Sequence, residues 1–221
     1  MFAGPAYEGL PAARDAAEVL TAALRKHLLC SDNDLREERK RAGTSLDLEL
    51  HFGLKARLSH GYFPASAYRT PMLMLLRQHP RIALDFIVSV FNHVADWYAH
   101  PRVTDRLEPA FEVELRFSNG SLKKQWCNGR LWNLYRGTSV GPYVLQSYLM
   151  ALECWLLEVA KQMPDELDAI VLDLLAKSDR ELQTLAGRVC AAANWHVSKT
   201  DSSRTQPARF EDAAYGPNRW D

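Results

Sequence analysis

An amphipathic segment enclosed by two His-Pro dipeptides constrains this fold more than any other feature of the sequence. Between His79-Pro80 and His100-Pro101, apolar residues recur every three or four positions, the period of a helix with one buried face. The residue before a proline is pushed out of the helical region, so each dipeptide marks a helix boundary. We therefore expect one long helix between the dipeptides. Its buried stripe consists of Ala83, Phe86, Ile87, Val90, Phe91, Val94, Trp97 and Tyr98.

Three helices are predicted on the N-terminal side of this segment. The first covers about residues 12–30 by its apolar period, and the mixed-charge run from Asp32 to Arg41 after it is typical of a solvated helix face or a connection. Thr44 and the carboxylate three residues later form a cap for a second helix, which should run to about Leu58. Thr70-Pro71 is a pre-organised start for a short third helix over 72–77.

Three more helices are predicted towards the C-terminus. Pro142 opens a long helix that Pro164 closes, and Ser178 begins a capping box for a last helix that extends to about Ala193. The segment 165–176 between them is apolar on more than one face, so we expect it to lie between two neighbours. Because the corners between helices are very short, successive helices should be antiparallel and in contact. The expected fold is mostly α, a layered, solenoid-like antiparallel helical array without a recognisable repeat period.

A β-hairpin is predicted as an insertion in this array, at about residues 111–127. Apolar and charged residues alternate from Phe111 to Phe117, Asn119-Gly120 follows, and a second short run ends near Trp126. Asn-Gly between alternating runs is a strong hairpin signal. We expect residues 1–197 to form a single helical domain that contains the hairpin, and residues 198–221 to be a polar, loosely ordered tail.

Composition limits the classes of function. Lys+Arg and Asp+Glu are equal at 27 each, so no global charge draws the chain to nucleic acid or acidic membranes. The four cysteines lack CxxC spacing, which favours a reducing compartment. The N-terminus has no secretory signal, and no stretch approaches the roughly twenty apolar residues of a membrane span. We therefore expect a cytoplasmic protein with no cofactor and no membrane partner.

Enzyme signatures are mostly absent, since the chain has no P-loop, Gly-x-Ser-x-Gly elbow, dinucleotide fingerprint or His-Glu-x-x-His helix. This favours a non-enzymatic role. One alternative is a metal-dependent hydrolase that uses His93, Asp96 and His100, whose spacing places them on one helix face. Against it, the row borders the apolar stripe and lacks a further ligand source.

The hairpin region provides the candidate interaction residues. Basic and aromatic side chains alternate there, a pattern that can stack bases and neutralise phosphates, so nucleic-acid binding is a second alternative. The favoured interpretation is structural: the aromatic residues anchor the hairpin to the helices and the lysines keep its outer edge soluble. The same aromatics, with one from the tail, are candidate anchors for a protein partner. These residues are Lys123, Lys124, Trp126, Arg130, Trp132, Tyr135, Arg136 and Trp220.

Two stretches carry a resemblance to a known family. Tyr62-Phe-Pro-Ala-Ser-Ala-Tyr-Arg-Thr-Pro71 runs into Leu84-Asp-Phe-Ile87, and Leu131-Trp-Asn-Leu-Tyr-Arg-Gly137 runs into Leu149-Met-Ala-Leu-Glu-Cys-Trp-Leu156. They resemble segments from the helical region of very large bacterial ATP-binding proteins, the STAND-type NTPases of antiviral defence. The resemblance covers about a third of the chain and consists of aromatic and packing residues.

This resemblance implies a helical scaffold or sensor region whose nucleotide site lies elsewhere in a longer polypeptide. Because this chain lacks a P-loop, ATP binding by its own residues is not implied. Taken together, the sequence favours a protein-interaction module whose partner is another protein or other domains of a longer chain.

Overall fold

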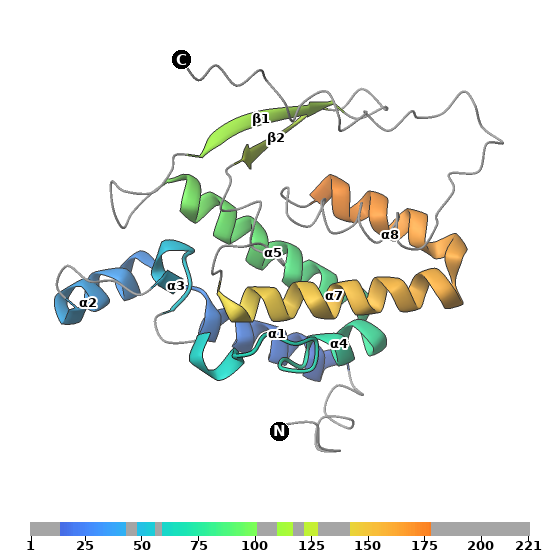
Figure 1. Cartoon of the computed structure of the whole chain (residues 1–221), viewed down its shortest axis with the longest axis horizontal. Coiled ribbons are helices and arrows are strands. Elements are labelled where there is room, and N and C mark those ends of the chain that lie inside the picture. Colours follow the sequence, from blue (N-terminus) through green and yellow to red (C-terminus); the bar gives the residue numbers. More distant parts are fainter. Residues whose placement is uncertain are drawn as a thin grey trace, which may run out of the picture.

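The computed structural model describes residues 14–42, 48–55, 59–100, 110–116, 122–127 and 142–177, and the described part is mostly helical, as predicted (Figure 1). The predicted helix after Ser178, the tail and the turn at Asn119-Gly120 lie outside these residues. The elements are α1 (Arg14–Leu28), α2 (Asp32–Ala42), α3 (Leu48–His51), the 3₁₀ turn η2 (Ser59–Tyr62), α4 (Met72–Gln78), α5 (Pro80–Ala99), β1 (Phe111–Arg116), β2 (Leu122–Cys127), α7 (Tyr143–Gln162) and α8 (Pro164–Lys177).

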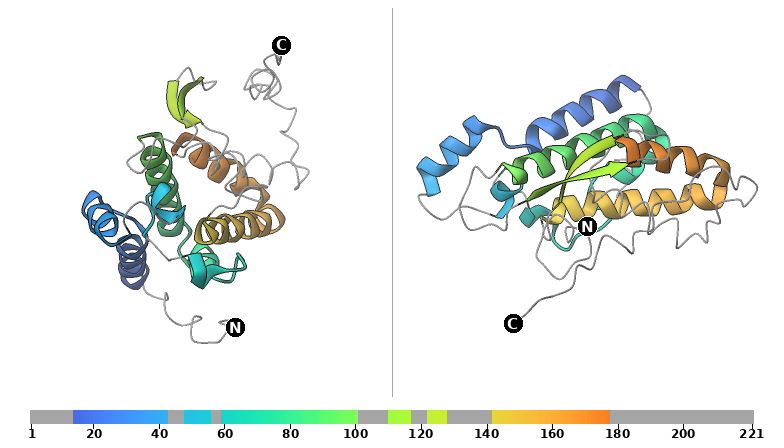
Figure 2. Two further views of the ribbon diagram at one scale, coloured as in Figure 1. Left: turned by 60° about the vertical axis from the view of Figure 1, so that its left-hand side comes forward. Right: turned by 90° about the horizontal axis from the view of Figure 1, so that it is seen from above.

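Helix α5 lies at the centre of the described fold because the apolar stripe predicted from the sequence is buried on it. Helix α1 lies on one side of α5, and α4 and α7 lie on the other (Figure 2). Phe86 of α5 and Tyr148 of α7 meet edge to face, with ring centroids 5.7 Å apart. Burying such aromatic pairs contributes more than their area alone. A repeated solenoid-like stacking of these helices is not confirmed.

The predicted proline corners are present. His79 ends α4 and begins α5: its backbone N–H donates to the Leu75 carbonyl at 2.7 Å, and its own carbonyl accepts from Ala83 at 3.1 Å. Met163 joins α7 to α8, and its backbone N–H donates to the Val159 carbonyl at 2.7 Å. Each corner is a single non-helical residue, so consecutive helices are close neighbours.

The predicted helix over 44–58 is wrong in its extent. Within the described residues, helix α3 ends at His51 and the chain turns at Gly53, whose φ is +67°. Leu54 then forms an isolated bridge with Leu29 instead of continuing a helical face. The cause is tertiary: the Gly53 carbonyl accepts from the Cys30 backbone N–H at 2.8 Å, so it is engaged across the fold.

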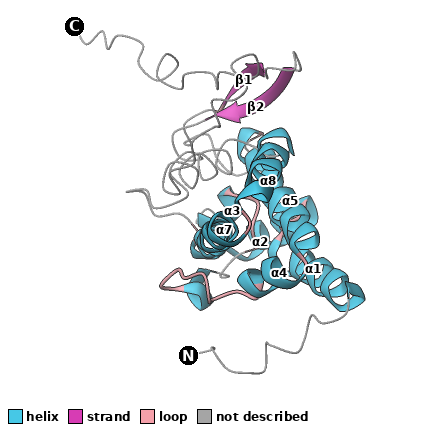
Figure 3. Cartoon of the chain, turned by 90° about the vertical axis from the view of Figure 1, so that its right-hand side faces the viewer, coloured by secondary structure: helices cyan, strands magenta, loops and turns pink. Residues whose placement is uncertain are grey.

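The two strands pair antiparallel where the alternation predicted them, and they lie together outside the helices (Figure 3). Trp126 is half-buried against the helical core, and its ring meets His100 at the end of α5 edge to face, with centroids 5.2 Å apart. Glu112 lies opposite Trp126 in the register and pairs with Lys124 at 2.9 Å. None of the described helices is both long and apolar enough to span a membrane.

Candidate interaction groove

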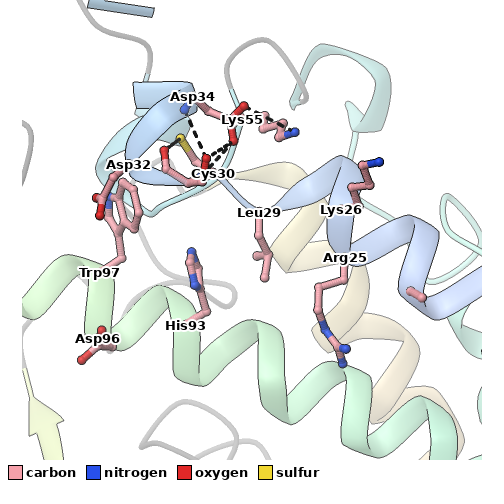
Figure 4. Close-up of a pocket in the computed structure, with 12 residues that line it drawn as sticks. Arg25, Lys26, Leu29, Cys30, Asp32, Asp34, Lys55, His93, Asp96 and Trp97 are labelled. Carbon is pink, nitrogen blue, oxygen red and sulfur yellow. Dashed lines mark hydrogen bonds and ion pairs between the residues drawn. The ribbon is translucent and has the colours of Figure 1, made fainter. Parts of the chain in front are cut away.

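A groove of about 810 Å³ lies where the C-terminal half of α1, the start of α2 and the second half of α5 meet. His93 and Trp97 point from α5 toward the α1–α2 link (Figure 4). The segment after α3 closes one side of the groove through Lys55. The lining residues are Ala22, Arg25, Lys26, Leu29, Cys30, Ser31, Asp32, Asp34, Lys55, His93, Asp96 and Trp97.

The wall of the groove is held by hydrogen bonds between segments far apart in the sequence. The indole N–H of Trp97 donates to the Leu50 carbonyl at 3.0 Å, and His93 contacts the Gly53 carbonyl through Nε2 at 3.2 Å. A carbonyl is only an acceptor, so Nε2 of His93 carries a proton in this contact. The rings of His93 and Trp97 also pack on each other, with centroids 5.5 Å apart. These contacts orient both side chains and leave them little freedom to rearrange.

The start of α2 in the groove is a capping box. The Ser31 hydroxyl accepts from the Asp34 backbone N–H at 3.2 Å, and the Asp34 carboxylate accepts from the Ser31 backbone N–H at 2.9 Å. This pair satisfies two backbone donors at the helix start. The Ser31 hydroxyl also donates to the Asp34 carboxylate at 2.7 Å. The hydrogen bonds that the Ser31 backbone N–H and hydroxyl donate to this carboxylate lower the pKa of Asp34, and Lys55, 3.8 Å away, acts in the same direction. Asp34 is therefore a charged structural cap at neutral pH.

Cys30 lies beneath this cap and is not a nucleophile at neutral pH. Its side chain is only 2% exposed, and its thiol donates to the Ser31 carbonyl at 3.4 Å. Burial, with the negative charge of Asp34 as the next cause, raises the pKa of the thiol to about 11. Because the thiolate is the reactive form, the neutral thiol behaves as a small apolar group in the core.

The rim of the groove carries charges of both signs. Arg25 is already oriented, since it donates to the Ser89 hydroxyl at 2.9 Å and lies over the Phe86 ring at 5.8 Å. Lys26 is exposed on α1, and Asp96 is exposed on the facing helix α5. The groove thus combines an apolar floor with a mixed polar rim, as binding sites commonly do.

The geometry gives no support to a metal site at His93, Asp96 and His100. Among the described residues, no group of three or more His, Cys, Asp or Glu side chains is arranged to hold a metal ion. His93 turns to the Gly53 carbonyl, whereas Nδ1 of His100 lies 3.0 Å from the Asp96 carbonyl at the end of its own helix. The side chains of Asp96 and His100 do approach each other, with Oδ1 and Nδ1 3.4 Å apart, but His93 turns away to the Gly53 carbonyl, so the three do not converge on one point.

The hairpin candidates are only partly described. Trp126 anchors β2 to the helical core and Lys124 is paired with Glu112, which is the structural arrangement favoured from the sequence. Lys123 lies in β2, but its side chain is outside the described part. The remaining candidates also lie outside the described residues: Arg130, Trp132, Tyr135, Arg136 and, in the tail, Trp220.

Sequence reasoning missed most of this groove. The Ser31-x-x-Asp34 spacing carried a signal for the cap at the start of α2, because serine three residues before an acid is a capping pattern. For Ala22, Leu29 and Lys55 no local pattern exists, since they line the groove only once three segments meet.

No family model matches the chain, and a comparison with curated proteins gives no match either. The function is therefore inferred from the groove and its chemistry.

Proposed function

We propose that this chain is a non-enzymatic protein-interaction module and that the groove between α1, α2 and α5 receives a segment of a protein partner. One observation carries the proposal: the histidine, the cysteine and the capping aspartate that line the groove are already used by the fold. His93 holds the Gly53 carbonyl, Asp34 caps α2, and burial keeps the Cys30 thiol protonated. A concave surface with occupied polar groups is suited to binding rather than to catalysis.

The size and lining of the groove favour a peptide segment as the ligand. A volume of about 810 Å³ holds several side chains, and Ala22 and Leu29 give part of its floor an apolar character. Lys26 on α1 and Asp96 on α5, whose carboxylate also lies 3.4 Å from Nδ1 of His100, offer rim contacts of opposite sign, which would set the direction of a bound segment.

Two neighbouring alanines of α1 provide a matched test. Ala22 lines the groove, whereas Ala23 is exposed on the same helix and does not line it. Ala22→Arg should fill the groove, and Ala23→Arg should change the charge and bulk of α1 without filling it. Both substitutions keep a good helix former, so neither should unfold α1.

The tagged full chain and both variants are used to capture proteins from an extract of the source cells, and affinities are then measured with each purified captured protein. The proposal expects a partner that binds the wild type and Ala23→Arg equally and binds Ala22→Arg at least about tenfold more weakly, a loss of about 1.4 kcal/mol. A partner that binds all three proteins equally would show that the groove is not the contact surface.

We further propose that this module is part of a larger protein. The stretches that resemble STAND-type NTPases include Leu84–Ile87 on α5 and Leu149–Leu156 on α7, whose apolar side chains pack in the same core. That location supports a likeness in helical packing. We propose a cytoplasmic, solenoid-like scaffold or sensor region of a larger bacterial antiviral-defence ATPase. If an ATPase is captured by the wild type but not by Ala22→Arg, this result would support a place in a larger defence ATPase. If none of the proteins bound through the groove is an ATPase, the result would count against it.

A further inference from the structure

Helix α8 has a second apolar side that no described element covers. Leu167, Val171 and Leu174 are buried against the helices beneath, each at most 3% exposed. Leu172 instead is 62% exposed, and Ala169 and Ala176 are exposed as well. The sequence predicted neighbours on two sides of this helix, and the described residues provide them on one side only, along α7 and α5 (Figure 1).

Ala169, Leu172 and Ala176 form a single stripe, which we name the α8 outer stripe. At about 100° per residue, the spacings of three and four place them together, nearly opposite the buried side. Leu172 stands between two small side chains, so the backbone of a partner helix can approach closely on either side of it. A contiguous arrangement of this kind marks interaction surfaces more often than a single exposed leucine does.

Acidic residues lie at the N-terminal end of the α8 outer stripe and along its borders. Asp165, Asp168 and Asp173 are exposed on α8, and Lys177 balances only the last of them, at 2.8 Å. Neither Asp165 nor Asp168 forms an ion pair with a described residue at salt-bridge distance. Within the described part of the chain, the stripe therefore has an excess of negative charge around it.

The face is rigidly placed. The side-chain amide of Asn92, on α5, donates to the Lys177 carbonyl at 3.0 Å and so holds the C-terminal end of α8. Lys177 also lies 4.0 Å from Asp85 of α5. A surface that is ordered before binding loses little conformational entropy when a partner docks.

From this arrangement we propose that the α8 outer stripe binds a basic amphipathic helix of a protein partner, with leucine-type residues against Leu172 and lysine or arginine residues against Asp165 and Asp168. A second copy of the chain fits less well, because the exposed charged residues on its own α8 are mostly acidic, so this helix lacks the basic residues that would complement Asp165 and Asp168. This surface is separate from the groove and does not depend on it.

The test uses a labelled helical peptide of about four turns, with leucines spaced three and four residues apart and lysines on both borders. Its binding to the full chain is measured by fluorescence anisotropy at low and high salt. Leu172→Asp should weaken binding about tenfold or more. Val19→Asp is the matched control, since Val19 is 69% exposed on α1, far from α8 in the sequence. Binding to this control should equal that of the wild type.

Two further peptides complete the experiment. A peptide with glutamates in place of the lysines should not bind, and a scrambled peptide of unchanged charge should bind much more weakly than the designed one. Failure of the wild type to bind the designed peptide, equal binding by Leu172→Asp, or equal binding of the scrambled peptide would each overturn the proposal. A dimer in sedimentation equilibrium that Leu172→Asp abolishes would overturn it in favour of self-association.

Discussion

Gly53 lies directly against Trp97: a β-carbon on Gly53 would come within 2.6 Å of the indole Cγ atom and within 2.9 Å of Nε2 of His93. Its φ of +67° lies in the left-handed region, where only glycine is free of steric cost. No other amino acid can therefore replace Gly53 without displacing the rings of Trp97 and His93, which line the groove.

Gly53→Ala should destabilise the fold by roughly 2–4 kcal/mol, because left-handed backbone strain adds to overpacking against Trp97. Gly61→Ala is the control, since nothing lies within 4 Å of the corresponding β-carbon position, and it should change the stability by less than about 0.5 kcal/mol. Urea unfolding of both variants measures the difference. Equal unfolding free energies for Gly53→Ala and Gly61→Ala would contradict the close contact between Gly53 and Trp97.

The capping box at the start of α2 predicts a pH-dependent contribution from Asp34. Its folded pKa is lowered from the ordinary value of 3.8, so its stabilising effect is present above that value and is lost as the pH falls through the folded pKa. The difference in unfolding free energy between the wild type and Asp34→Asn should therefore be largest at neutral pH and shrink below about pH 4.

Ser31→Ala serves as the companion variant, because it removes the hydroxyl cap and leaves the carboxylate in place. It should cost about 1 kcal/mol at neutral pH, as the loss of an N-cap usually does. Thermal or urea unfolding at pH 7 and pH 3 checks both variants. If the wild type and Asp34→Asn respond identically to acid, the hydrogen bonds from Ser31 do not determine the pKa of Asp34.

Arg77 of α4 and Glu158 of α7 form a two-point ion pair between helices, with the Nε–Oε2 contact at 2.9 Å. The pair is partly exposed, so we expect a coupling free energy of about 0.5–1 kcal/mol in a double-mutant cycle with alanine, falling as salt is added. The exposed pair of Arg14 and Glu18 within α1 is the comparison and should couple more weakly. Equal coupling free energies in the two cycles would contradict the prediction that the Arg77–Glu158 pair is the stronger one.

The buried thiol of Cys30 should react slowly. Because burial raises its pKa to about 11, thiolate is scarce at pH 8 and the sulfur is also shielded. We expect peptide-mapping mass spectrometry to show that iodoacetamide labels Cys30 far more slowly in native than in urea-unfolded protein. The same shift predicts a loss of stability as the pH rises above 9.0, the ordinary thiol value, toward 11. Rapid labelling of native Cys30 would contradict its burial.

Much of the helical framework could be predicted because its signals are local. The His79-Pro80 corner, the apolar stripe of α5 and the alternation of β1 each depend on residues a few positions apart. Steric restriction before proline and the helical and strand periods act within that range. The observed bounds, Pro80–Ala99 for α5 and Phe111–Arg116 for β1, follow these patterns closely.

The candidate site was much less predictable. His93 and Asp96 were singled out for their spacing, yet the structure gives them different roles, because spacing on a helix says nothing about what faces it. His93 meets a carbonyl 40 positions away, and Trp97 meets one 47 positions away. Periodicity contains no information about contacts at that separation.

By itself, the sequence determined where the helices α4, α5, α7 and α8 begin and end, since proline sterics and apolar period act on neighbouring residues. Only the tertiary structure decided that the chain turns at Gly53, that Trp97 and His93 close over that turn, and that Leu172 is left uncovered by the described elements. These outcomes depend on which surfaces meet after the chain has folded. The free energy of such contacts comes from burial and hydrogen bonds between distant segments, and it outweighs the weak local preference that predicted a longer helix at 44–58.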